Sequence, residues 1–382
     1  MKTRIGINAN NISSGGGLTH LLEFLRGVNK IKEHKVTIVV WSSKETLMKL
    51  PSYEFILKKS HILLNQNSLM SLLWQLVFLT PCCRKEKIDV LLSPGGTYSG
   101  SFHPNVSMCQ NMLPFQFDQA RKYKVSFTFI RLMMLRFLQS KAFKNADGLI
   151  FLSTFAKSTV EKMLRLNGQA KIISHGIPHR FFKHPRQQKD VLKSHAEEPY
   201  RLIYVSKLDV YKNQNKLIRA VSDLRASNHL NLKLKLVGPA YSRSLREYRN
   251  LKNLVDQDNK WLSYIGDVNY ERLHEFYHKS DLGIFISSCE NLPIILLETM
   301  AAGLPIVCSK TGPMPEILGK SAFYCDPENV NSIKQAISTA ISSKTKRTTF
   351  AGQSYRTAFA YSWDKSTKLT INFLKLVAKK KN

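Results

Sequence analysis

Acidic residues are scarce in this chain of 382 residues, which has 27 Asp and Glu against 57 Lys and Arg. The formal net charge of +30 argues against a polycationic partner and favours an anionic one. Nucleic acid, an anionic membrane surface and phosphorylated substrates all satisfy this requirement. Composition alone does not choose among them.

Cysteine is also sparse. The six residues are scattered and show neither CxxC spacing nor a His/Cys cluster of the kind that holds zinc. This pattern excludes a disulfide framework and a structural zinc site, and it predicts buried thiols in a reducing compartment. The six are Cys82, Cys83, Cys109, Cys289, Cys308 and Cys325.

Long hydrophobic runs are missing. The longest, residues 68–79, has 12 residues, whereas a helix that spans a bilayer needs roughly 20. The N-terminus has a short apolar stretch where a signal peptide would have a longer hydrophobic region. We therefore expect a cytoplasmic protein that does not cross a membrane.

Short β-like runs alternate with helical patterns, which is typical of an α/β fold with parallel sheets. The length fits two domains, and a polar, aperiodic stretch after about residue 179 predicts the linker between them. We predict domains at 1–180 and 200–360, a linker at 181–199 and a helix at 361–382. Strands are expected at residues 4–9, 36–41, 90–92, 106–109 and 148–152, then at 201–206, 232–237, 261–266 and 282–287, and a further strand is expected to begin with residues 305–309.

Two glutamates, Glu290 and Glu298, stand eight residues apart around an apolar run. The pattern predicts a strand at 282–287, a loop that contains Glu290, and a helix at 293–302 that contains Glu298, with Gly303 after its end. The start of such a helix favours phosphate, and both carboxylates could accept hydrogen bonds from sugar hydroxyls. By spacing alone, Glu298 could equally face solvent while Glu290 interacts with the helix dipole.

Two lysines, Lys207 and Lys212, follow the strand predicted at 201–206. Cations at the carboxyl end of a strand can stabilise the charge that grows on a diphosphate leaving group. In a lysine-rich chain, this pair means little by itself.

Together these motifs resemble the retaining nucleotide-sugar glycosyltransferases of family four, which have the GT-B fold of two Rossmann-like domains with parallel sheets facing across a cleft. Glu290 and Glu298 match the E-x7-E motif of that family, and Lys207 and Lys212 match its Arg and Lys, with Lys in place of the usual Arg. Residues 309–318, which include Gly312, match its next loop. The resemblance is strongest to enzymes that build bacterial surface polysaccharide such as lipopolysaccharide O-antigen.

The N-terminal half matches that family more loosely. Gly16 and Gly17, in a run of glycines after the first strand, stand where the family brings backbone close to donor phosphate or acceptor. Residues 93–96 and 174–177 also fit family loops, although His175 reads equally well as an ordinary hinge residue. Many relatives have a histidine after the strand at 106–109, where this chain has Asn111, which cannot act as a general base. His20 and His103 are alternatives that we expect to be structural.

The resemblance implies a UDP- or GDP-linked sugar donor with its ribose on Glu298, its diphosphate on Lys207 and Lys212, and its sugar near Glu290. Backbone at Asn291, Leu292, Pro293 and Gly312 would lie beside the phosphates. We expect no cofactor and no metal, because lysines and helix ends supply the positive charge.

The acceptor is expected to be a saccharide or lipid-linked saccharide that enters from the N-terminal domain. Residues 119–146 contain seven Lys or Arg, no acid and many apolar side chains. This basic amphipathic segment is either a core-packed helix with a solvated basic face or a contact with anionic lipid on the inner face of the cytoplasmic membrane.

Rival functions stay open. A nucleic-acid-binding protein would explain the charge, but no helix-turn-helix, RRM or KH signature is present. A phosphorylase or an epimerase would share the architecture. A non-catalytic GT-B protein that binds a nucleotide-sugar is the stronger alternative, because of Asn111 and Lys207.

Overall fold

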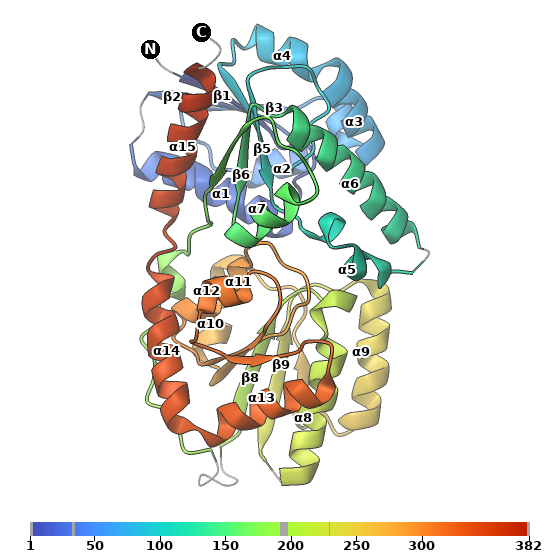
Figure 1. Ribbon diagram of the computed structural model, residues 1–382, viewed down its shortest axis with the longest axis vertical. Helices are drawn as coiled ribbons and strands as arrows, with labels where there is room; N and C mark the ends of the chain where they lie inside the picture. Colours follow the sequence, from blue (N-terminus) through green and yellow to red (C-terminus); the bar gives the residue numbers. More distant parts are fainter. Residues whose placement is uncertain (1–2, 33–34, 125, 192–197, 229, 380–382) are drawn as a thin grey trace. The chain divides into compact units, whose positions relative to one another are not determined.

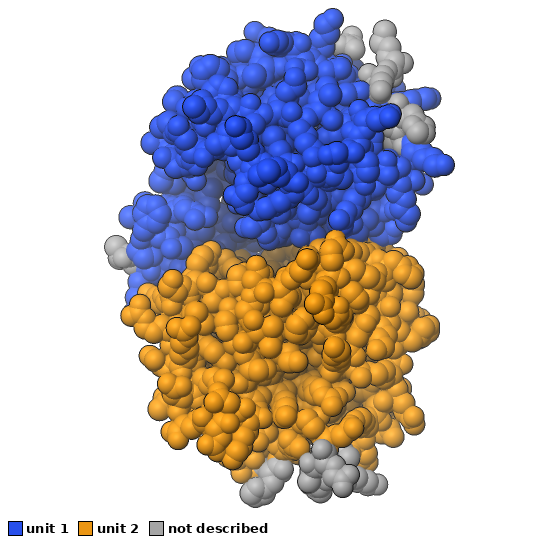
Figure 2. Space-filling model, turned by 180° about the vertical axis from the view of Figure 1, so that it is seen from behind, with its two compact units in different colours: residues 1–176, 362–382 blue, residues 177–361 orange. Residues whose placement is uncertain are grey.

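The computed structural model describes residues 3–32, 35–124, 126–191, 198–228 and 230–379. The chain divides into two compact units, coloured separately in Figure 2. Unit 1 contains residues 1–176 and 362–382, and unit 2 contains residues 177–361. Each unit is an α/β domain around a parallel sheet (Figure 1).

Unit 1 has a seven-stranded sheet in the order β3-β2-β1-β4-β5-β6-β7. The strands β4 and β6 are buried along their whole length, as expected for parallel strands with helices on both faces. The strands are β1 (Thr3–Asn8), β2 (Val36–Trp41), β3 (Ile56–Lys59), β4 (Val90–Ser93), β5 (Asn105–Cys109), β6 (Gly148–Phe151) and β7 (Gln169–Ile172). The helices are α1 (Gly15–Lys30), α2 (Lys44–Lys49), α3 (Ser68–Val77), α4 (Leu79–Lys85), α5 (Phe117–Arg121), α6 (Phe127–Asn145) and α7 (Thr154–Glu161).

The last helix, α15 (Trp363–Lys379), also belongs to unit 1, where it packs on α1 (Figure 1). Its Ile371 and Leu374 are buried. The approach is close at Gly27 in α1, where an added Cβ would lie 2.2 Å from Oγ1 of Thr367. The two helices therefore meet at a position where only glycine fits without a shift.

Unit 2 has a six-stranded sheet in the order β10-β9-β8-β11-β12-β13, the strand order of a Rossmann fold. The strands are β8 (Tyr200–Val205), β9 (Leu232–Val237), β10 (Leu262–Tyr264), β11 (Leu282–Phe285), β12 (Ile306–Ser309) and β13 (Phe323–Cys325). The helices are α8 (Gln214–Asn228), α9 (Ser242–Val255), α10 (Leu273–His278), α11 (Ile294–Ala301), α12 (Met314–Leu318), α13 (Val330–Ser342) and α14 (Lys344–Ala358). The strand order reverses between β8 and β11, and loops at their carboxyl ends form the usual ligand site of such a sheet.

The predicted α/β class with two Rossmann-like domains is confirmed, and three strands escaped prediction, namely β3, β7 and β13. The boundary differs from the expected one, because unit 2 begins at Ile177. Within the expected linker, Phe181 is fully buried and Gln188 accepts a hydrogen bond from Arg347 at 3.3 Å, so this stretch packs onto unit 2. Residues 192–197, also in that linker, lie outside the described residues.

None of the helices in the described part of the chain is both long and apolar enough to cross a bilayer.

Candidate active site

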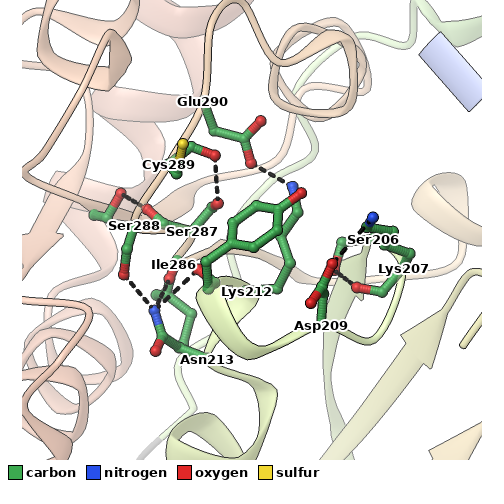
Figure 3. A network of polar contacts seen from close by, with 12 residues as sticks. Ser206, Lys207, Asp209, Lys212, Asn213, Ile286, Ser287, Ser288, Cys289 and Glu290 are labelled. Carbon is green, nitrogen blue, oxygen red and sulfur yellow. Dashed lines mark hydrogen bonds and ion pairs between the residues drawn. The ribbon is translucent and has the colours of Figure 1, made fainter. Parts of the chain in front are cut away.

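An ion pair joins two loops at the carboxyl edge of the unit 2 sheet. Lys212 ends a short 3-10 turn after β8, Glu290 follows β11, and Nζ of Lys212 donates to the Glu290 carboxylate (Figure 3). The side chains are only 8% and 13% exposed. A nearly buried charge is costly unless an opposite charge lies beside it, so separating this pair is unfavourable. The pair therefore holds the two loops together.

A second cation, Lys207, lies in the same loop and is more open, with a side chain that is 36% exposed. Its Nζ lies 3.0 Å from the Asp209 carboxylate and donates to the Tyr241 hydroxyl at 3.2 Å. Although burial alone would lower the pKa of Lys207, Asp209 and Tyr241 outweigh it and raise the pKa. The ammonium group is therefore charged and partly accessible.

Two amide side chains after Lys212 brace these loops. Asn213 is left-handed, with φ of 59°, and its Nδ2 donates to the Ser288 hydroxyl at 2.7 Å and to the Ile286 carbonyl at 3.1 Å (Figure 3). Gln214 donates to the Ser206 hydroxyl at 2.7 Å. Neither residue was predicted as part of the site from the sequence. An asparagine directly before a helix, in a tight turn, was the available signal.

The helix α11 begins just after Glu290, and its N-terminus has no side-chain cap. The first N–H groups of α11 and the positive end of its dipole therefore follow closely after Glu290, the partner of Lys212. Asn291 and Leu292 are both buried. Pro293 has no N–H, so it could lie beside a phosphate but could not donate a backbone hydrogen bond to it. In the neighbouring loop, Gly312 has φ of +63°, a conformation that favours glycine.

Glu298 is buried one turn further along α11, with 1% exposure. Its Oε2 accepts a hydrogen bond from the Tyr277 hydroxyl of α10 at 3.3 Å, and Tyr270 and Arg180 also lie close enough to affect it. Burial raises the pKa of Glu298 to about 8, although these neighbours act in the opposite direction. The ribose contact stays a prediction.

The predicted residues of unit 1 also come together, at the carboxyl edge of its own sheet. Gly16 and Gly17 lie in the first turn of α1. A Cβ at Gly17 would sit 3.5 Å from Oε1 of Gln110, which adjoins Asn111, while one at Gly16 would meet nothing within 4 Å. Asn111 is exposed, and its Oδ1 accepts the Leu113 N–H at 3.0 Å.

The three histidines that the sequence offered, His20, His103 and His175, contact other side chains of unit 1. Nδ1 of His20 and Nδ1 of His175 lie 3.1 Å apart, in a buried cluster with Trp363. Burial lowers the pKa of His20 to about 4, and burial together with His20 lowers the pKa of His175. His103 precedes β5 at the opposite edge of the sheet from Asn111 and pairs with Asp147 at 2.7 Å.

One Asp-x-Asp sequence, Asp256 and Asp258, was missed at the sequence level. The Asp256 carboxylate accepts the N–H groups of Lys260 at 2.8 Å and Leu262 at 2.8 Å, so it organises the turn before β10. Asp258 pairs with Lys260. Within the described residues, no group of three or more His, Cys, Asp or Glu is arranged to hold a metal ion.

The architecture of two Rossmann-like units is the GT-B fold, and solved glycosyltransferases share it along the whole chain. A structure of WaaG, a glycosyltransferase involved in lipopolysaccharide biosynthesis, superposes with a TM-score of 0.72 at 13% identity and covers 97% of this chain and 99% of its own. The Anabaena protein HepE in complex with UDP and glucose has a TM-score of 0.70 at 16% identity, with 98% and 99% covered. At these identities, the likeness concerns the fold alone.

Residues 186–357 match the family described as glycosyl transferases group 1. This range takes up nearly all of unit 2. The O-antigen chain mannosyltransferase B of Escherichia coli is 27% identical over 182 residues, which are 46% of this chain and 45% of that protein. The chain thus spans about half the length of this curated relative. The predicted resemblance to GT-B enzymes of the lipopolysaccharide and O-antigen type is confirmed.

Proposed function

We propose that this chain transfers a sugar from a nucleotide-sugar donor to a saccharide or lipid-linked saccharide, with retention of the anomeric configuration. The observation that supports the donor side best is the Lys212–Glu290 pair beside the uncapped N-terminus of α11. It places a buried cation, a carboxylate and free N–H groups at one sheet edge, which suits a diphosphate next to a sugar ring.

In this proposal, the diphosphate lies against Lys207, Lys212 and the backbone of Asn291, Leu292 and Gly312. The donor is UDP- or GDP-linked. Positive charge from the two lysines and the helix N-terminus stabilises the leaving nucleoside diphosphate, and no metal or other cofactor takes part. Glu290 accepts hydrogen bonds from sugar hydroxyls, and Glu298 accepts them from the ribose.

The reaction breaks the bond between the anomeric carbon and the β-phosphate oxygen and forms a bond from that carbon to the acceptor oxygen on the same face. The proton of the acceptor hydroxyl passes to the departing phosphate oxygen. This route needs no side-chain base, which is consistent with Asn111 where a histidine is common. On unit 1, the backbone of Gly16 and Gly17 is assigned to contacts with donor phosphate or acceptor, and the side chain of Asn111 to a hydrogen bond with a sugar hydroxyl.

We infer that the acceptor belongs to bacterial surface polysaccharide synthesis at the inner face of the cytoplasmic membrane. The relative that builds O-antigen and the fold shared with a lipopolysaccharide enzyme support this assignment. The net charge of +30 supports a location at an anionic membrane surface. The protein would then be cytoplasmic and peripheral on the membrane, without binding nucleic acid.

A nucleotide-sugar-binding protein without transferase activity is the second candidate. The observation that favours it is Asn111, whose side chain is occupied by the Leu113 N–H and offers no base. The two candidates share the donor site and differ in turnover. Release of nucleoside diphosphate in the presence of acceptor separates them.

The test is thermal stabilisation by a panel of UDP-, GDP- and TDP-sugars. A ligand present at a hundred times its dissociation constant stabilises the folded state by about 2.7 kcal/mol. We expect one nucleotide class to stabilise the protein and Lys207→Met to weaken this effect, with Lys346→Met, an exposed lysine of α14, as the matched control. If no nucleotide-sugar stabilises the wild-type protein, the proposal fails.

A further inference from the structure

The helix α6 leaves large apolar side chains in solvent. Phe127 is 82% exposed, Phe137 70%, Met134 58% and Ile130 55%. They stand at positions i, i+3, i+7 and i+10, so they share one side of the helix. Four large apolar side chains gathered in this way mark an interaction site rather than scattered exposure.

The opposite side of α6 is anchored in the core of unit 1. Leu132, Ala142 and Phe143 are buried, and the Phe143 ring stacks on Phe115 with centroids 5.7 Å apart. The helix therefore cannot turn its apolar side inward without losing these contacts. The expected core-packed helix with a solvated basic face is therefore present, but its outward face is apolar as well as basic.

Two cations, Arg131 and Lys141, are exposed among these apolar side chains. The sequence contains no acidic residue between Asp118 and Asp147. Within the described residues, neither Arg131 nor Lys141 takes part in an ion pair. The face thus combines uncompensated positive charge with aromatic and aliphatic groups.

The preceding short helix continues the same composition. In α5, Phe117 is 41% exposed and its ring lies against Phe129 of α6 with centroids 6.2 Å apart. The Arg121 guanidinium lies 5.3 Å from the centroid of the Phe117 ring. Figure 1 shows α5 beside the N-terminal end of α6. By contrast, α3 exposes Leu69, Leu73 and Leu76 but contains no charged residue.

We propose that α6 docks the protein on an anionic lipid bilayer. Phe127, Ile130, Met134 and Phe137 enter the boundary between headgroups and acyl chains, while Arg131 and Lys141 contact lipid phosphates. Charge complementarity selects this occupant, since cations without neighbouring acids fit an anionic surface. The inference rests on the membrane location in the proposed function and adds the surface responsible.

Flotation with phosphatidylcholine vesicles, with and without phosphatidylglycerol, tests the proposal. Each basic residue at an anionic surface contributes about a fivefold change in partitioning. Arg131→Gln with Lys141→Gln should therefore reduce binding to the anionic vesicles about thirtyfold. The matched control removes two exposed arginines of α9, Arg246→Gln with Arg249→Gln, and should change binding far less.

The apolar contribution is tested by Phe127→Ser with Phe137→Ser, against Phe359→Ser, an aromatic residue that is 60% exposed in unit 2. We expect at least a tenfold loss for the α6 variant alone. Unchanged binding of both α6 variants overturns the proposal, and so does equal binding to neutral vesicles. A lipid-free dimer that Phe127→Ser with Phe137→Ser dissociates would also overturn it, because a second copy would then cover the face.

Measuring donor binding as well as vesicle binding distinguishes a failure of the docking proposal from a failure of the proposed function. Stabilisation by nucleotide-sugar should be the same for the α6 variants as for the wild-type protein, because the donor residues lie in unit 2. Vesicle binding without any donor effect would refute the proposed function and leave the docking surface intact. The converse result would refute only the docking surface.

Discussion

Glu298 offers a measurable test of the structure, because a carboxyl group this deeply buried must change stability with pH. The replacement Glu298→Gln keeps the size of the side chain and an oxygen that can accept the Tyr277 hydroxyl. It removes only the ability to ionise. The difference between wild type and variant therefore isolates this one carboxyl.

The magnitude follows from the shift of the pKa from 4.5 to about 8. Below about pH 4.5 the carboxyl is protonated in the folded and unfolded states and contributes no pH dependence. Between about pH 4.5 and 8 the unfolded chain releases the proton while the folded protein keeps it, so the free energy of unfolding falls as pH rises. The free energy of unfolding falls by about 1.4 kcal/mol for each pH unit in this range. The total decrease therefore reaches about 5 kcal/mol at pH 8 and then stays constant.

Urea unfolding of both proteins from about pH 5 to about pH 8.5 is the assay. The stability of Glu298→Gln relative to wild type should rise with pH and level off near pH 8. Glu275→Gln, at a carboxylate of α10 whose pKa is lowered by its hydrogen bond with Arg272, should show no such gain. A difference that does not vary with pH would mean that Glu298 is ionised in the fold, and the reasoning would be refuted.

Three further predictions concern stability, each measured by urea unfolding. Lys212→Met should destabilise unit 2 by about 3 kcal/mol because it leaves the Glu290 carboxylate buried and unpaired, and adding Glu290→Gln should recover at least half. Arg347→Met should cost about 3 kcal/mol, because the fully buried guanidinium donates to the carbonyls of two residues at the end of α13. Gly27→Ala, which in an open helix would stabilise, should instead cost about 1 to 3 kcal/mol through its clash with Thr367, and Thr367→Ala should restore most of the loss.

All the central strands, where both faces of the sheet are covered, were predicted from sequence, and so was the edge strand β10. β2 and β9 have the predicted bounds, and the other predicted strands differ by one or two residues at one or both ends. The missed β3, β7 and β13 are short and lie at the sheet edges. β3 has two lysines and β7 has no fully buried residue, so an apolar run could not reveal them.

Part of the candidate site could be predicted from the sequence, because its residues follow apolar strands at short distances along the chain. Lys207, Lys212 and Glu290 follow β8 and β11, and adjacent parallel strands bring their loops together. The burial of Glu298 could not be predicted from the sequence. Its cover comes from Tyr277, which stands 21 residues earlier in the chain. Contacts of that kind depend on how helices pack over the sheet, and periodicity within one helix does not contain this information.

The buried Glu298 and the exposed α6 are departures from the same rule, that ionisable groups lie outside and apolar groups lie inside. A carboxyl with a raised pKa and a solvent-exposed phenylalanine both cost stability, so neither is expected in a fold selected for stability alone. In the two proposals, a ligand compensates each of them, with hydroxyl donors for Glu298 and a lipid phase for Phe127. The two departures lie in different units, one beside the proposed donor site and one on the proposed membrane surface. Such a division suits an enzyme that must hold a water-soluble donor while it stays at the membrane that contains its acceptor.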